Sequence, residues 1–137
     1  MLEKLLATAC MTLLSAGMAL ADSHGDLTGD PENGERVFRK CKACHAVGEG
    51  AKAKTGPVLN GVVGREIAAQ PDFDYSDALK ELSAKDGTWT PEELAAFLEK
   101  PRDFAKGTKM SFAGLRKEEE RADVIAYLAT FSMEGGS

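Results

Sequence analysis

The stretch Cys41-Lys42-Ala43-Cys44-His45 places two thiols and an imidazole within five residues. Thiols at positions i and i+3 lie on one side of a helical turn, so each can add to one vinyl group of a haem. The histidine that follows then lies at the face of the ring, where it can bind the iron. The pattern C-x-x-C-H therefore predicts one covalently attached haem c, with His45 as an axial ligand.

Other uses of a cysteine pair fit the chain less well. Beyond this motif the chain has only Cys10 and His24 as further thiol and imidazole, whereas a structural zinc site needs four ligands. A thioredoxin-like motif requires a βαβ context, and no strand pattern is visible. A disulfide between Cys41 and Cys44 stays open as an alternative, but it gives His45 no role.

The second face of the iron is either open, as gas binding or catalysis requires, or filled, as in electron transfer. Of the five methionines, three fall within the first 21 residues and Met133 lies near the end of the chain. Met110 lies in a polar loop, where a methionine is poorly placed for a core. This favours Met110 as the second ligand, which indicates electron transfer at a comparatively high reduction potential.

The first 21 residues resemble an export signal. Lys4 precedes an apolar run from Leu5 to Leu20, and Ala19-Leu20-Ala21 fits the A-x-A cleavage rule. The alternative, a membrane anchor, is less favoured because polar and small residues interrupt a short run. We therefore expect a cleaved signal over 1–21 and a single domain over 22–137, in the periplasm and without a membrane span.

Capping signals and helical periodicity predict an all-α fold. Only 7% of the 137 residues are aromatic, so a large apolar cofactor would help to fill the core. Residues 46–72 and 102–115 are rich in glycine and are expected to be loops. Helices are predicted from Asp30 to about Cys41, over 77–83 with Ser76 as cap, from a Thr90–Glu93 capping box to Lys100, and over 117–131.

Charge is unevenly distributed along the chain, whose formal net charge is −5. Residues 36–65 have seven basic side chains and one acidic, and residues 100–117 have six and one. Both predicted iron ligands lie in these basic segments. The alternatives are ordinary solvated charge or a basic rim around the haem edge that steers acidic partners. An acidic, exported chain does not indicate nucleic-acid binding.

The chain resembles the class I cytochromes c, in particular the bacterial cytochrome c-two type. The resemblance spans nearly all of residues 30–131. It rests on Gly34 and Phe38, C-K-A-C-H, T-G-P-V-L-N-G-V-V-G-R (55–65), Tyr75-Ser76-Asp77-Ala78, Thr88-Trp89, G-T-K-M-S-F-A-G-L (107–115) and A-D-V-I-A-Y-L (122–128). It implies a small fold of four to five helices whose long loops wrap one haem.

The resemblance also implies site residues. Cys41 and Cys44 would form the thioethers, and His45 and Met110 would be the axial ligands. Pro57 would accept a hydrogen bond from the ring of His45. The remaining cofactor-binding residues are Arg65, Tyr75 and Trp89, near the haem propionates, and Thr108 in the ligand loop. Gly34 and Phe38 would pack against Tyr127 where the terminal helices cross.

Three positions depart from the family pattern. Phe97 stands where a tyrosine hydroxyl often reaches the methionine sulfur, and Phe73 replaces another pocket tyrosine. Lys106 stands where proline is frequent. Loss of a hydrogen bond to the ligand sulfur is expected to alter the reduction potential and the firmness of the Met110–iron bond, and Lys106 is expected to loosen the ligand loop.

The resemblance implies a one-electron carrier that is not an enzyme. Its donor would be a membrane cytochrome bc complex, and its acceptor a terminal oxidase or a photosynthetic reaction centre, with docking at a lysine-rich haem-edge face. The protein is expected to be a monomer. Two alternatives stay open: a haem subunit dedicated to one periplasmic dehydrogenase, and a ligand-binding or peroxidase-type haem protein with a labile sixth ligand.

Overall fold

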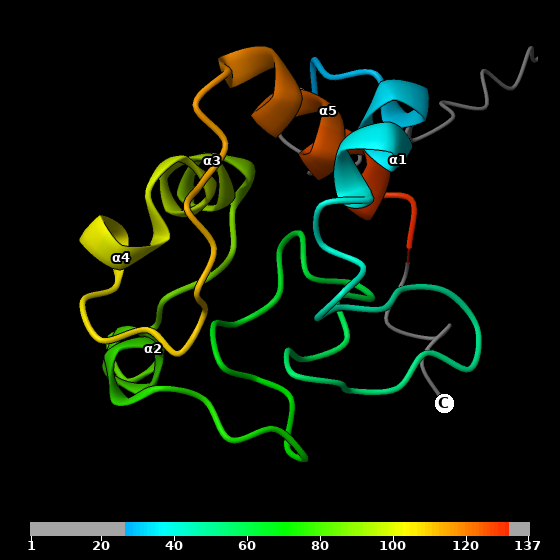
Figure 1. Ribbon diagram of the computed structural model, residues 1–137. Coiled ribbons are helices and arrows are strands. Elements are labelled where there is room, and N and C mark those ends of the chain that lie inside the picture. Colours follow the sequence, from blue (N-terminus) through cyan, green and yellow to red (C-terminus); the bar gives the residue numbers. More distant parts are fainter. Residues whose placement is uncertain (1–26, 132–137) are drawn as a thin grey trace, which may run out of the picture.

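The computed structural model describes residues 27–131 and contains five helices there (Figure 1). These are α1 (Pro31–Phe38), α2 (Asp77–Ser83), α3 (Pro91–Glu99), α4 (Pro101–Phe104) and α5 (Glu118–Leu128). The extended structure found in this range is one isolated bridge between Glu66 and Thr88. The predicted all-α fold is confirmed. The predicted signal over 1–21 and Met133 lie outside the described residues.

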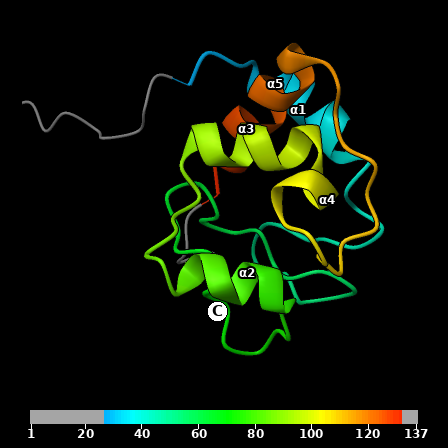
Figure 2. The ribbon, with the colours of Figure 1, turned by 90° about the vertical axis from the view of Figure 1, so that its left-hand side faces the viewer.

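Helices α1 and α5 pack against each other, although they come from opposite ends of the described chain (Figures 1 and 2). Asp30 caps α1 with its carboxylate, and its own N–H donates to Asp123 Oδ1 of α5 at 2.7 Å. A Cβ at Gly34 would collide with the Asp123 carbonyl, which explains a glycine inside a helix. Phe38 and Tyr127 pack with ring centroids 5.5 Å apart, as predicted.

Helices α2 and α3 begin at the predicted caps. Ser76 Oγ accepts from the N–H of Leu79 at 3.4 Å, and Thr90 Oγ1 accepts from the N–H of Glu93 at 3.1 Å. The predicted capping box is only half formed. The N–H of Thr90 donates instead to the Thr88 carbonyl at 2.8 Å, so it is not available to the Glu93 carboxylate.

The helices differ from the prediction at three places. Helix α1 ends at Phe38 rather than near Cys41, and residues 39–44 continue as turns. Residues 102–115 are not entirely loop. Helix α3 ends at Glu99, and Pro101 begins the short turn of α4, in which the N–H of Ala105 donates to the Pro101 carbonyl at 3.0 Å. Proline is suited to a first helical position, where no N–H partner is needed. Helix α5 ends at Leu128 rather than Phe131, and residues 129–131 continue as turns.

The helices and the long loops enclose the core from opposite sides. The segment from 39 to 76 has no helix and lies across from α3, α4 and the loop that leads to α5 (Figure 1). Its loops follow the prediction for residues 46–72. The side chains that are buried on both sides are mostly apolar, and they include Val37, Phe38, Val62, Ile67, Trp89, Leu94, Phe97, Leu98, Leu115, Val124, Ile125 and Leu128.

Candidate haem-binding site

A cavity of about 240 Å³ lies between the long loops and the helices. Apolar side chains from α1, α3 and α5 form much of its wall, among them Leu94, Leu98 and Val124. All nine site residues predicted from the sequence line it: Cys41, Cys44, His45, Pro57, Arg65, Tyr75, Trp89, Thr108 and Met110. The fold thus brings together residues that are up to 69 positions apart, from Cys41 to Met110.

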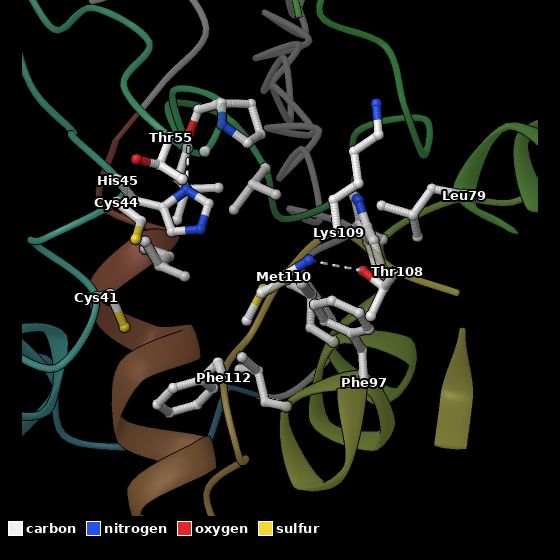
Figure 3. Close-up of a pocket in the computed structure, with 18 of the residues that line it drawn as sticks. Cys41, Cys44, His45, Thr55, Leu79, Phe97, Thr108, Lys109, Met110 and Phe112 are labelled. Carbon is white, nitrogen blue, oxygen red and sulfur yellow. Dashed lines mark hydrogen bonds between the residues drawn. The ribbon is translucent and has the colours of Figure 1, made fainter. Parts of the chain in front are cut away.

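The cysteine motif forms one helical turn after α1. The carbonyl of Cys41 accepts from the N–H of Cys44 at 3.1 Å and from that of His45 at 2.9 Å. This turn places both thiols at one edge of the cavity (Figure 3). The two thiols form no disulfide with each other. Burial raises the pKa of Cys41, and the neighbouring positive charge of Lys40 opposes the rise.

The His45 ring is held on two sides. Its Nδ1 lies 2.8 Å from the Pro57 carbonyl, as the resemblance implied, and a carbonyl only accepts, so Nδ1 carries the proton. Nε2 then has a free lone pair on the side of the ring that faces the cavity (Figure 3). Burial lowers the pKa of His45, and the hydrogen bond to Pro57 opposes this. The neutral imidazole that results is the form that binds a metal.

Gly56 lies directly behind this ring. A Cβ at Gly56 would stand 2.5–2.9 Å from three atoms of the imidazole, closer than nonbonded carbon atoms approach. The glycine therefore allows the loop to press against the ring. The N–H of Gly56 donates to the Cys44 carbonyl at 2.8 Å, which ties this loop to the cysteine turn.

Arg65 is buried, with 8% of its surface exposed, and reaches the cavity. Its Nη1 donates to the carbonyls of Asn60 at 2.9 Å and Val58 at 3.3 Å. Its Nε is buried and finds no hydrogen-bond partner among the residues that the structure describes. Burial lowers the pKa of Arg65, but a guanidinium stays charged at neutral pH. A buried cation with an unused donor fits a carboxylate at this end of the cavity.

Tyr75 and Trp89 line the cavity and are 7% and 6% exposed. The hydroxyl of Tyr75 accepts from the N–H of Gln70 at 3.2 Å, which leaves its own proton to donate elsewhere. Burial raises the pKa of Tyr75, while the Gln70 hydrogen bond and the charge of Arg65 oppose the rise. The phenol is thus neutral at physiological pH and is a hydrogen-bond donor.

Met110 lies across the cavity from His45, in the loop between α4 and α5 (Figure 3). Its N–H donates to Thr108 Oγ1 at 3.3 Å. Its side chain is partly buried and packs against the apolar core. Phe97, 7% exposed, lines the cavity beside the ligand loop and has no hydroxyl to offer.

Several wall residues were not predicted from the sequence. Thr55, Leu79 and Phe112 line the cavity, as do Lys40 and Lys109 from the two basic segments. The Thr55-Gly56-Pro57 turn and the residues beside Met110 gave a signal for some of them, but no local pattern shows that Leu79 of α2 reaches the same cavity.

The family model described as Cytochrome c matches residues 31–132. The chain belongs to the cytochrome c family. Among its relatives, cytochrome c-550 of Ancylobacter novellus is 52% identical over 105 residues, which are 77% of this chain and 98% of the relative. Cytochrome c2 of Agrobacterium tumefaciens (strain II Chrys) is 49% identical over 100 residues, which are 73% and 90% of the two chains.

A solved structure gives the same result for the fold. The structure of cytochrome c2 from Rhodospirillum centenum has a TM-score of 0.71 at 44% identity, and the match covers 76% of this chain and 99% of the other. The resemblance to a bacterial class I cytochrome c of the cytochrome c2 type is therefore confirmed, and so is the predicted fold class.

Cytochrome c family members bind haem c covalently, and Cys41 and Cys44 stand in the expected C-x-x-C-H region. The predictions of haem c as cofactor and of an electron carrier rather than an enzyme are confirmed by this membership. The cavity fits the cofactor, because its wall is largely apolar while the free Nε of Arg65 offers a donor to a carboxylate. None of the helices within residues 27–131 has the length and apolar character needed to cross a bilayer.

Proposed function

We propose that this cytochrome c is a periplasmic one-electron carrier whose haem iron is bound axially by His45 and Met110. The observation that carries the proposal is the position of these two side chains on opposite sides of one cavity, with the cysteine pair at its edge. When bound, haem c supplies a one-electron iron couple. Because His45 and Met110 would both bind the iron, the haem would have no open position for a substrate.

The other residues of the cavity have distinct roles in this proposal. Pro57 orients the His45 ring and keeps its proton on Nδ1, which leaves Nε2 free to bind a metal. Arg65, Tyr75 and Trp89 would hold the haem carboxylates. The side chains of Leu94, Leu98 and other wall residues exclude water, which keeps the reorganisation around the iron small.

Replacement of the second ligand tests the axial assignment. In the oxidised Met110→Ala variant, the methionine-to-iron charge-transfer absorption is expected to disappear, while the covalently held haem stays attached. Met133→Ala serves as the control and should retain the band. A band that survives in Met110→Ala would show that another group binds the iron. Rapid, tight binding of carbon monoxide to the native reduced protein would favour the alternative with a labile sixth ligand.

We propose further that the protein carries electrons from a membrane cytochrome bc complex to a terminal oxidase or a photosynthetic reaction centre. Lysine side chains around the haem cavity would contact acidic surfaces of these complexes. Lys40 and Lys109 line the cavity, and Lys42 and Lys106 are exposed in the same two basic segments. Steering of this kind predicts that rising ionic strength slows electron transfer to a physiological complex. A rate independent of salt would contradict the docking face.

Residues 1–21 would direct export and then be removed after Ala21, leaving residues 22–137 as one monomeric domain in the periplasm. The expected mass of the periplasmic haem protein corresponds to a chain that begins at Asp22 with one haem. A membrane-bound form that retains residues 1–21 would support an anchor instead.

A further inference from the structure

The backbone of the ligand loop, residues 105–117 between α4 and α5, is hydrogen-bonded to the rest of the protein mainly at its two ends. At the first end, the N–H of Thr108 donates to the Ala105 carbonyl at 2.9 Å. At the other, Leu115 donates to the Leu98 carbonyl at 2.7 Å and accepts from Arg121 Nη1 at 2.7 Å. Between Met110 and Leu115 the backbone of the loop forms no hydrogen bond to another residue of the described range.

One contact joins the loop to a distant segment directly beside Met110. Lys109 Nζ lies 2.6 Å from Asp74 Oδ2 and 3.0 Å from the Asp74 carbonyl oxygen, a link between positions 35 residues apart. The other carboxylate oxygen, Asp74 Oδ1, lies 3.2 Å from Lys80 Nζ of α2. The Asp74 carboxylate thus bridges two lysines and connects the loop to α2.

The backbone on either side of Asp74 is firmly placed. Tyr75 and Ser76, which follow it, are 7% and 4% exposed. Phe73, which precedes it, packs edge-on against Tyr75 with ring centroids 4.9 Å apart, and Ser76 caps α2. Although the Asp74 side chain itself is exposed, it therefore extends from a fixed point of the cavity wall.

We infer that Asp74 is a positioning residue for Met110: its carboxylate holds Lys109, and with it the ligand loop, against the segment that precedes α2. The inference rests on the proposed ligation of iron by Met110. A tie at the adjacent residue restricts the outward movement of the loop and so keeps the thioether at the iron. Because the ion pair is exposed to water, its contribution is modest and depends on salt.

The test uses the oxidised holoprotein and the rate at which imidazole displaces Met110, at a pH where imidazole is neutral. At saturating imidazole this rate reports the departure of Met110. The isosteric Asp74→Asn variant loses the charge but keeps the backbone carbonyl, so we expect an increase of about three-fold. Added salt should raise the rate of the native protein toward that of the variant and should change the variant little.

Asp77→Asn is the matched control. Asp77 lies 3.9 Å from Lys80 Nζ on the same helix and is even more exposed to water than Asp74, but it forms no ion pair with Lys109. Its variant should exchange at the native rate, whereas an equal increase in both variants would overturn the inference. An Asp74→Asn rate equal to the native one, with the native charge-transfer band present, would overturn this inference alone. A native protein without that band would instead overturn the proposed ligation.

The reciprocal variant distinguishes a direct tie from a general effect of charge. Lys109→Gln should also accelerate displacement of Met110, and the Asp74→Asn/Lys109→Gln double variant should exchange no faster than the faster single variant. Additive effects in the double variant would show that the two side chains act independently and would overturn the inference.

Discussion

On the His45 side of the cavity, the imidazole is hydrogen-bonded to the Pro57 carbonyl at 2.8 Å and backed by Gly56, and all of these groups are at least partly buried. On the Met110 side, the loop is held beside the ligand by Thr108 and by an ion pair between Lys109 and Asp74 that is open to water. The two predicted ligands thus face each other from supports of different strength.

The difference follows from solvent access. Water competes little for a buried hydrogen bond, whereas an exposed ion pair exchanges with water and salt at small cost. The His45 side is therefore expected to be rigid and the Met110 side adjustable. If Met110 binds the iron as proposed, the rigid side would keep the haem attached while the adjustable side would control access to the iron.

The largest expected effect comes from Gly56→Ala, which disturbs the rigid side. The added methyl group would overlap the His45 ring, and overpacking of this kind costs about 3 kcal/mol. Denaturant unfolding of the holoprotein measures the loss. Gly50→Ala is the control, because nothing lies within 4 Å of its Cβ and only its positive φ of 70° opposes the change, at about 1 kcal/mol. Equal losses in both variants would contradict a tightly packed His45 ring.

Arg65→Met removes a second support of the loop that contains Gly56 and Pro57. The variant removes the donors to the carbonyls of Val58 and Asn60, next to the Pro57 acceptor of His45. Lost hydrogen bonds from a charged buried group predict about 2 kcal/mol lower unfolding free energy, measured by denaturant. Arg65→Lys keeps the charge but not the several donors of the guanidinium, so its unfolding free energy should lie between that of Arg65→Met and that of the native protein. An Arg65→Met variant as stable as the native protein would contradict a role for Arg65 in supporting this loop.

Thr108→Val probes the adjustable side with a smaller change. It removes the acceptor for the N–H of Met110 while keeping the shape of the side chain, at a cost of about 1 kcal/mol. The loss should appear as roughly five-fold faster displacement of Met110 by imidazole, with little change in unfolding free energy. A stability loss as large as that of Gly56→Ala would show that the Met110 side is as rigid as the His45 side.

The smallest effect concerns pH. The chain has two tyrosines, and burial raises the pKa of both Tyr75, at the cavity, and Tyr127, at the crossing of α1 and α5. A raised pKa favours the neutral phenol in the folded state, so the linked stability is complete below about pH 10 and is lost as pH rises above it. In the folded protein, tyrosinate absorption should rise at a higher pH than in the denatured chain. In the Tyr127→Phe variant, the signal comes from Tyr75 alone. If the tyrosines of the folded protein titrated at the same pKa as those of the denatured chain, the effect of burial would be contradicted.

The sequence by itself determined the local features. Ser76 and Thr90 begin helices because a side-chain oxygen can cap the backbone within three residues, and Cys41, Cys44 and His45 share one turn through their spacing. The family resemblance, which depends on several motifs in a fixed order, extended the prediction from this turn to all nine site residues. Local rules failed beside Pro101, because Lys100 is both the C-cap of α3 and the N-cap of α4. They also failed at Glu93, because the N–H of its expected capping partner Thr90 donates elsewhere.

Only the tertiary structure decided how the two sides of the cavity are supported. Gly56 behind the His45 ring and Asp74 against Lys109 are contacts between segments 11 and 35 positions apart, and no periodicity or capping rule relates such positions. They depend on how the long loops close around the cavity, which is set by packing of the whole chain. For that reason the sequence predicts the two ligands, while the structure shows that His45 is backed by buried contacts and that the residue beside Met110 is held by an ion pair open to water.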